Sequence, residues 1–119
     1  MSSSIKRIGN SPRWSDIVIY QGVARWVEVA EDTSGDERGQ IQQVLRQIDQ
    51  TLCEIGSSRQ QMLQIIVHLS SLQSVDELNR QWDQWVPQGN APVRACVQSG
   101  LGGNCLVEMV IEAAVVSGS

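Results

Sequence analysis

Two charged side chains stand out because each lies in an otherwise apolar segment near the end of the chain. Arg94 lies within 92–98, and Glu108 lies within 106–112. A charge among apolar neighbours is costly unless it has a partner or reaches water. Arginine binds a carboxylate through two parallel hydrogen bonds, and glutamate can orient or deprotonate a water molecule. The pair therefore indicates either a site for a small carboxylate that reacts with water or a structural Arg94–Glu108 ion pair between subunits. Ion pairs of the second kind are common, so spacing alone favours it.

The elements that would position these side chains are two β-strands. Pro92 opens a strand that continues to Gln98, and a last strand is expected from Leu106 to about Val115. Side chains alternate between the two faces of a strand. Arg94 therefore shares a face with Cys96 and Gln98, while Glu108 shares a face with Val110 and Glu112.

The rest of the chain predicts an α+β fold in which two helices pack on one face of a mixed β-sheet. Apolar residues three and four positions apart predict helices over 37–55 and 75–85. Runs rich in β-branched residues predict a hairpin of 17–20 with 23–30, and a strand at 62–69 that is buried on both faces. Each helix has one apolar stripe, so both fit on the same side of the sheet. We expect other copies of the chain to cover the second side.

Composition limits the classes of partner. The chain has 119 residues, which predicts a single domain over 1–119. With 9 basic and 13 acidic side chains its net charge is -4, which argues against nucleic acid as a partner. The sequence shows no long apolar span and no signal-peptide pattern near its first residue, so we expect a cytoplasmic protein without a membrane partner. Cys53, Cys96 and Cys105 are expected to be free thiols.

Other residues that could do chemistry have simpler explanations. His68 is the only histidine and lacks ligand partners at usable spacing, so a structural role is favoured over a metal site. Trp82 and Trp85 lie at helical spacing and are typical of a core rather than of a base-stacking platform. The glycine-rich segment 100–103 has no following helix and no Lys-Ser/Thr pair, so it is typical of a hairpin connection rather than of a phosphate loop.

Several segments together resemble the RidA/YjgF family. A Pro-x-Arg-x-x-Val pattern begins at Pro92, and a Val-Glu pair follows at Val107 and Glu108, as in the C-terminal signature of that family. The resemblance extends from about residue 5 to residue 115. Two upstream segments carry further similarity to the family: Gly56-Ser57 and Val75-Asp-Glu-Leu-Asn79. Two others are similar to the YoaB-type branch in particular: Arg13-Trp14-Ser15-Asp16 and the pair Trp82 with Trp85.

The resemblance implies a chorismate-mutase-like fold and a homotrimer with ligand clefts between subunits. It also implies hydrolysis of enamines and imines to 2-keto acids and ammonia, with no cofactor and no metal. Arg94 matches the arginine that binds the substrate carboxylate, and Glu108 matches the glutamate that positions water. Cys96 matches a pocket cysteine, Trp14 stands in place of a pocket tyrosine, and Asn79 matches a family asparagine.

One pair of residues departs from the family pattern, and three functional hypotheses stay open. Deaminating members carry a Ser-Gly or Thr-Gly pair where this chain has Val27-Glu28. Val27 lacks the hydroxyl, and Glu28 adds a negative charge beside a pocket meant for a carboxylate. The chain is therefore an imine hydrolase, a non-catalytic trimer that binds or senses a metabolite, or an endoribonuclease like that attributed to some relatives. The acidic charge counts most against the last.

Overall fold

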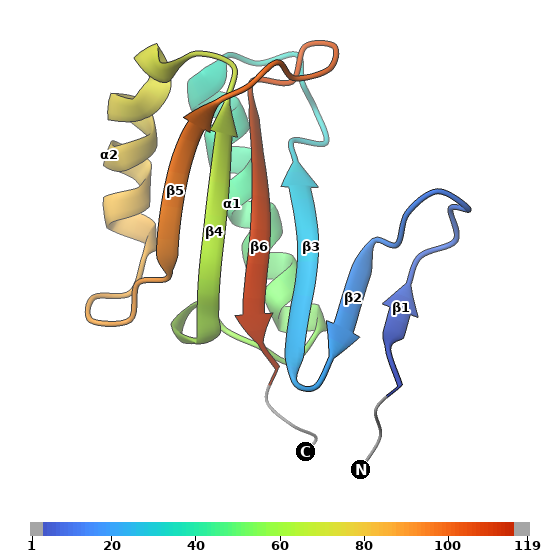
Figure 1. The fold of residues 1–119 in the computed structure, drawn as a ribbon. Helices are drawn as coiled ribbons and strands as arrows, with labels where there is room; N and C mark the ends of the chain where they lie inside the picture. The colour runs from blue at the N-terminus through green and yellow to red at the C-terminus, as the bar shows by residue number, and fades with distance from the viewer. Residues whose placement is uncertain (1–3, 116–119) are drawn as a thin grey trace.

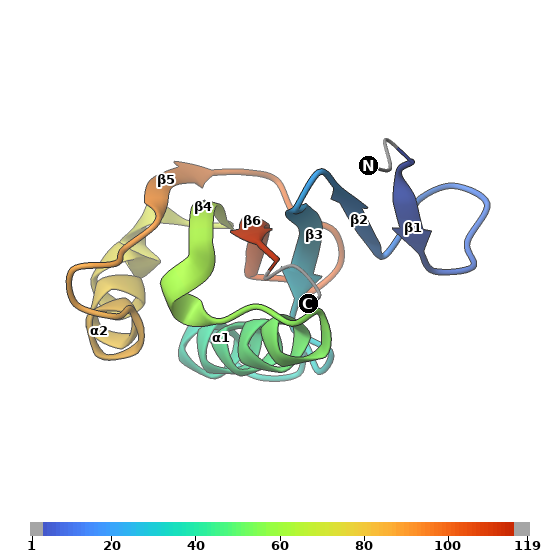
Figure 2. The ribbon, with the colours of Figure 1, turned by 90° about the horizontal axis from the view of Figure 1, so that it is seen from below.

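The protein is built on one mixed β-sheet with both helices on the same side. The computed structural model describes residues 4–115. The sheet order is β1-β2-β3-β6-β4-β5, and Figures 1 and 2 show α1 and α2 against one face. The elements are β1 (Lys6–Ile8), β2 (Ile17–Tyr20), β3 (Val23–Val29), α1 (Glu37–Glu54), the 3-10 turn η1 (Arg59–Gln61), β4 (Met62–Leu69), the 3-10 turn η2 (Leu72–Ser74), α2 (Val75–Trp85), β5 (Val93–Gln98) and β6 (Val107–Ala114). Neighbouring strands are antiparallel except β4 and β5, which are parallel. The expected α+β fold is confirmed.

Local chemistry accounts for the start of α1 and for the ends of both helices. The Asp36 carboxylate accepts a hydrogen bond from the Gly39 backbone N–H at 3.0 Å, which caps α1. After α1, Gly56 adopts a φ of 78°, a conformation that glycine reaches without steric cost. Pro87 follows α2 closely, and a proline cannot continue a helix in its interior.

The hydrophobic core lies between the helices and the sheet. The predicted stripe of α1 is buried from Ile41 to Leu52, and on α2 both Trp82 and Trp85 are only 7% exposed. From the sheet, alternate residues of β3, β4 and β6 point into this layer: Ala24, Trp26, Ile65, Val67, Leu69, Val107, Met109, Ile111 and Ala113. The two tryptophans therefore belong to the core, as their spacing indicated.

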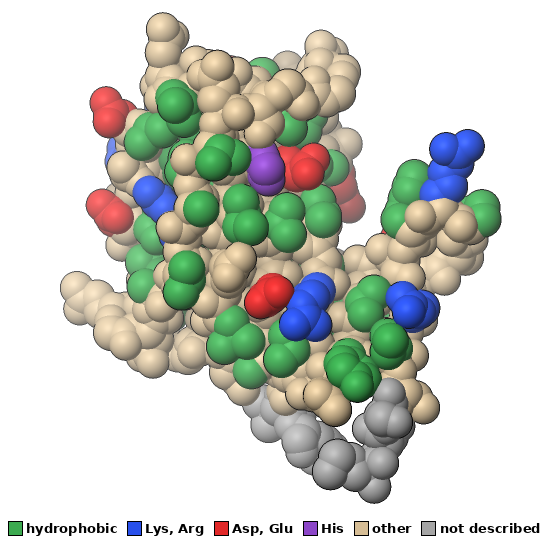
Figure 3. Space-filling model, in the orientation of Figure 1, with side chains coloured by type: hydrophobic (Ala, Val, Ile, Leu, Met, Phe, Trp, Pro, Cys, Tyr) green, Lys and Arg blue, Asp and Glu red, His purple; other side chains and the backbone are tan. Residues whose placement is uncertain are grey.

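The opposite face of the sheet is uncovered in the single chain and mixes exposed apolar side chains with a few charged ones, among them the Arg25–Glu112 ion pair (Figure 3). Val93 is 68% exposed, Val27 53%, Val29 41% and Val97 40%. Along β4, buried residues alternate with half-exposed ones. The expectation that this strand is buried on both faces is therefore wrong for an isolated chain, because nothing within residues 4–115 covers the second face.

Two further details differ from expectation. The short strand β1 was not predicted, because its three residues are too few to display an alternation. β5 and β6 do not form a hairpin, since β4 lies between them in the sheet. The glycine-rich segment after β5 is therefore a crossover connection. In the described part of the chain, neither helix is long and apolar enough to cross a membrane.

Candidate functional site

Arg94 lies on the edge strand β5 and points toward the helix layer. Its guanidinium carbon is 5.1 Å from the centre of the Trp82 ring, a cation–π contact, and the side chain is half-buried. Within residues 4–115 it forms no ion pair. A positive charge that packs on an indole without a carboxylate partner keeps its N–H groups available for an anion.

Cys96 shares a strand face with this arginine, and Asn79 lies one helical turn from Trp82. Cys96 is two residues further along β5, so its side chain points to the same face. Burial raises the pKa of the Cys96 thiol, and the charge of Arg94 opposes this rise only in part. Asn79 precedes Trp82 by three residues on α2, which places the two on the same side of that helix. Arg94 therefore contacts Trp82 directly, with Cys96 on the same strand face and Asn79 on the same helix side, and the raised pKa keeps the Cys96 thiol protonated near pH 7.

Glu108 projects from the other face of the sheet. Arg94 pairs with Ile65 on β4, and Ile65 pairs with Ile111 on β6; both isoleucines are fully buried beneath the helices. Glu108 is three residues before Ile111, so the alternation turns it to the uncovered face. No ion pair joins Arg94 to Glu108 in the described chain, and a contact between them remains a prediction for two different subunits.

His68 is the nearest polar neighbour of Glu108 across the sheet. The two residues are directly opposite in the β4–β6 register. Nδ1 of His68 lies 2.7 Å from Oγ of Ser99, the residue that follows β5. The sequence predicted a structural role for His68 but gave no sign of its place beside Glu108, because the pairing of β4 with β6 is long-range.

Trp14, Val27 and Glu28 meet at the other end of the sheet. They line a cleft of about 840 Å³ between β3 and the loop that joins β1 to β2. Trp14 is 65% exposed on that loop, and Val27 points to the uncovered face. The opposite wall is formed in part by Thr51 on α1. Three residues that the sequence singled out for ligand binding are thus brought together.

The Glu28 carboxylate is turned toward α1 and is fully engaged by the protein. It accepts hydrogen bonds from Trp26 Nε1 at 3.0 Å, Thr51 Oγ1 at 2.7 Å and Gln47 Nε2 at 3.1 Å. The negative charge that the sequence places beside the pocket is therefore not free to repel a ligand at full strength. Its charge is near the cleft, but it is held by three donors.

Comparison with known proteins identifies the family. A family model described as Endoribonuclease L-PSP matches residues 13–115. A RutC family protein from Haemophilus ducreyi is 39% identical over 93% of this chain and 97% of its own length. The RutC family protein YoaB of Escherichia coli is 37% identical over 94% of this chain and 99% of its own. The chain belongs to the RidA/YjgF family. A solved member of the YjgF protein family from Neisseria meningitidis superposes with a TM-score of 0.89 at 33% identity, covering 98% of each chain.

One RidA/YjgF chain does not bring all the predicted site residues together. Trp14 and Val27 lie by β1–β3, whereas Arg94 and Cys96 lie on β5 at the other edge of the sheet (Figure 1). Glu108 lies on β6, between those edges and on the uncovered face. Across residues 4–115 no group of three or more His, Cys, Asp or Glu side chains is arranged to hold a metal ion.

Proposed function

We propose that this RidA/YjgF protein is a homotrimer that binds 2-imino and 2-keto acids in clefts between subunits and hydrolyses imines to keto acids and ammonia. The observation that carries the proposal is the state of Arg94. Its guanidinium packs on Trp82, is half-buried, and has no carboxylate partner within residues 4–115. Such an arginine suits the carboxylate of a small ligand.

The separation of the site residues supports a location between subunits. In a ring of three identical chains, one edge of each chain contacts a different surface of the next. The cleft beside Trp14 and the β5 edge that carries Arg94 lie on opposite edges of the sheet, as such a contact requires. The uncovered apolar face, with Val93 68% exposed, supplies hydrophobic surface for the contact.

The chemistry then needs only orientation and electrostatics. Arg94 binds the substrate carboxylate, and Glu108 of a neighbouring chain takes a proton from water as its oxygen bonds to the imine carbon. Addition of water to the protonated imine gives an adduct with one hydroxyl and one amine on the same carbon, and Glu108 then returns its proton to that amine. The carbon–nitrogen bond breaks and ammonia leaves, while the hydroxyl loses its proton to become the carbonyl of the keto acid. Cys96 contributes a neutral thiol to the pocket, while Asn79 and Trp14 contribute polar and aromatic walls.

The test is release of ammonia and keto acid from freshly generated 2-iminobutanoate. We expect Arg94→Ala and Glu108→Gln each to lower kcat/KM by about 100-fold or more, since each removes an interaction with the reacting groups. Arg46→Ala removes an exposed arginine on α1 that the proposed site does not use, and it serves as the matched control. Equal rates for the wild type and Arg94→Ala would remove the catalytic role of Arg94.

A second candidate is a trimer that binds a metabolite without turnover, and Val27 is the observation that favours it. This residue lines the cleft without the hydroxyl that deaminating members carry. Under this alternative, 2-ketobutanoate raises the Tm of the wild type but not of Arg94→Ala, and no ammonia is released from the imine. The endoribonuclease description of the family model adds RNA cleavage as a third assay, although a net charge of -4 disfavours RNA binding. Cleavage that survives both Arg94→Ala and Glu108→Ala would lie outside this site.

A further inference from the structure

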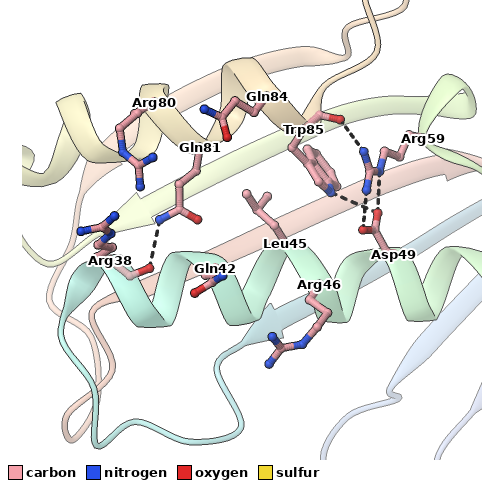
Figure 4. Close-up of a pocket in the computed structure, with 10 residues that line it drawn as sticks. All are labelled: Arg38, Gln42, Leu45, Arg46, Asp49, Arg59, Arg80, Gln81, Gln84 and Trp85. Atoms are coloured by element: carbon pink, nitrogen blue, oxygen red, sulfur yellow. Dashed lines mark hydrogen bonds and ion pairs between the residues drawn. The ribbon is translucent and has the colours of Figure 1, made fainter.

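A second groove lies on the outer side of the molecule, between α1 and α2 (Figure 4). It has a volume of about 460 Å³, and four of its ten lining residues are arginines: Arg38, Arg46, Arg59 and Arg80. The chain has only 9 basic residues in total and a net charge of -4. A concentration of arginines in one groove of an acidic protein therefore calls for an explanation beyond solubility.

The two carboxylates near the groove are already satisfied by other groups. Both oxygens of Asp49 accept hydrogen bonds from Arg59 at 2.7 Å, and one also accepts from Trp85 Nε1 at 3.0 Å. At the other end, Glu77 accepts from Arg80 at 3.0 and 2.6 Å and from Gln81 at 2.7 Å. The strongest contacts of both carboxylates are therefore with Arg59 and Arg80, and neither acid is free to neutralise a further arginine fully.

Two arginines are left with little or no compensation. Arg46 forms no ion pair or hydrogen bond with any residue of the described chain. Arg38 reaches Glu77 only at 3.9 Å, and its side chain is 70% exposed. Four arginines against the two acids Asp49 and Glu77 leave two positive charges in excess. Gln42 and Gln84 add amide donors to the groove lining.

We infer that the groove between α1 and α2 binds a small anion that carries two or more phosphate groups. Guanidinium groups match phosphate oxygens in two-pronged geometry. Arg38 and Arg46 are eight residues apart on α1, which is about 12 Å along the helix axis. An extended anion such as a polyphosphate chain can satisfy both ends, whereas a single phosphate suits only one. Leu45 lines the groove and the two helices form its walls, so its shape suits a small ligand rather than the flat surface of a large partner.

This site does not depend on the function proposed above. The groove is on the helix side, whereas the proposed subunit contacts use the uncovered face of the sheet together with the β5 edge and the cleft beside Trp14 (Figures 2 and 3). None of the ten residues that line the groove belongs to those surfaces, so the groove would stay open to solvent in such an assembly. An anion there would contact both helices and stabilise their packing.

The experiment is isothermal titration calorimetry of the full-length protein with sodium tripolyphosphate, with orthophosphate at matched ionic strength for comparison. We expect saturable binding of tripolyphosphate, at least tenfold tighter than that of orthophosphate, because more phosphates meet more arginines. Arg46→Gln and Arg38→Gln should each weaken binding about fivefold, as expected for one partly exposed charge contact. Arg13→Gln, which removes an exposed arginine outside the groove, should change it less than twofold.

The variants also separate a specific site from general attraction. Arg46 has no partner to lose, so Arg46→Gln should leave the Tm of the free protein unchanged. Equal weakening by Arg46→Gln and Arg13→Gln, or the absence of saturable tripolyphosphate binding, would overturn the inference. Imine hydrolysis should be unchanged in Arg46→Gln, which keeps this outcome distinct from that of the proposed function.

Discussion

The contact between Arg94 and Trp82 joins the core to the proposed chemistry. The indole is only 7% exposed and is fixed by the packing of α2 on the sheet. A guanidinium that lies 5.1 Å from such a ring loses conformational freedom before any ligand arrives. Less entropy is then lost on binding, which is the usual benefit of a preorganised site. A lysine at this position would have neither the planar stacking nor the two-pronged geometry.

Glu28 is predicted to stabilise the fold, although it lines the cleft. Replacing it with alanine removes the acceptor of three hydrogen bonds and leaves Nε1 of the buried Trp26 without a partner. We expect Glu28→Ala to lower the free energy of unfolding by about 2 kcal/mol. Urea denaturation measures the change. As a control, Glu31→Ala at a nearby exposed position should change the free energy of unfolding by less than about 0.5 kcal/mol. An equally small effect of Glu28→Ala would contradict a stabilising role for Glu28.

The sequence identified the departure at Val27-Glu28 but not its structural meaning. The donors that hold Glu28 come from Gln47 and Thr51, which are 19 and 23 positions away along the chain. Only the packing of α1 over β3 brings them together. A motif comparison sees a negative charge where the family has glycine, and it cannot see that α1 supplies the partners.

At the scale of elements, Glu77 connects the two helices and should make stability depend on pH. It accepts hydrogen bonds from Arg80 and Gln81 on α2, and Gln81 also donates to the backbone of Arg38 on α1. These contacts, with the hydrogen bond from Arg80 largest, lower the Glu77 pKa from 4.5 to about 2. The folded-state pKa is below the unfolded value, so the contribution is complete above pH 4.5. It is lost as the pH falls from 4.5 toward 2.

The measurement is the Tm of the wild type and of Glu77→Gln between pH 7 and pH 2. We expect the wild type to have the higher Tm at pH 7 and the difference to vanish near pH 2, where Glu77 itself becomes protonated. The control is Glu31→Gln, because Glu31 is exposed and forms no ion pair within residues 4–115. It corrects for the general effect of low pH on the Tm. A Tm difference that is constant across this range would show that the carboxylate charge is not what matters.

Most elements could be predicted from local pattern, whereas their neighbours in the sheet could not. The stripes of α1 and α2 and the hairpin of β2 with β3 follow from spacing and turn chemistry within a few residues. The insertion of β4 between β5 and β6 depends on pairings between distant segments. For the same reason the sequence predicted which residues share a face with Arg94 or with Glu108, but not that these faces are opposite.

At the scale of the whole molecule, the uncovered face and the divided site point to the same requirement for a second chain. The sheet face opposite the helices combines exposed valines with Glu108 and the His68 beside it. An apolar sheet face left in water is unfavourable, and burying it between copies would also bring the β5 edge of one chain toward the cleft of another. Assembly and site formation are therefore predicted to be lost together.

Val93→Glu tests this coupling without disturbing the fold of one chain. The Val93 side chain is 68% exposed, so a glutamate there remains solvated in a monomer, but it would be buried without a partner in an assembly formed through this face. We expect sedimentation equilibrium to give the wild type three times its chain mass of 13.1 kDa. The protein concentration at which the assembly dissociates should be at least about 100-fold higher for Val93→Glu than for the wild type. Imine hydrolysis should fall with the trimer fraction. Gln50→Glu, which adds the same charge at an exposed position on α1, should keep both the trimer and the activity. A wild type that sediments as a 13.1 kDa monomer, or a Val93→Glu monomer that retains full activity, would contradict a site built between chains.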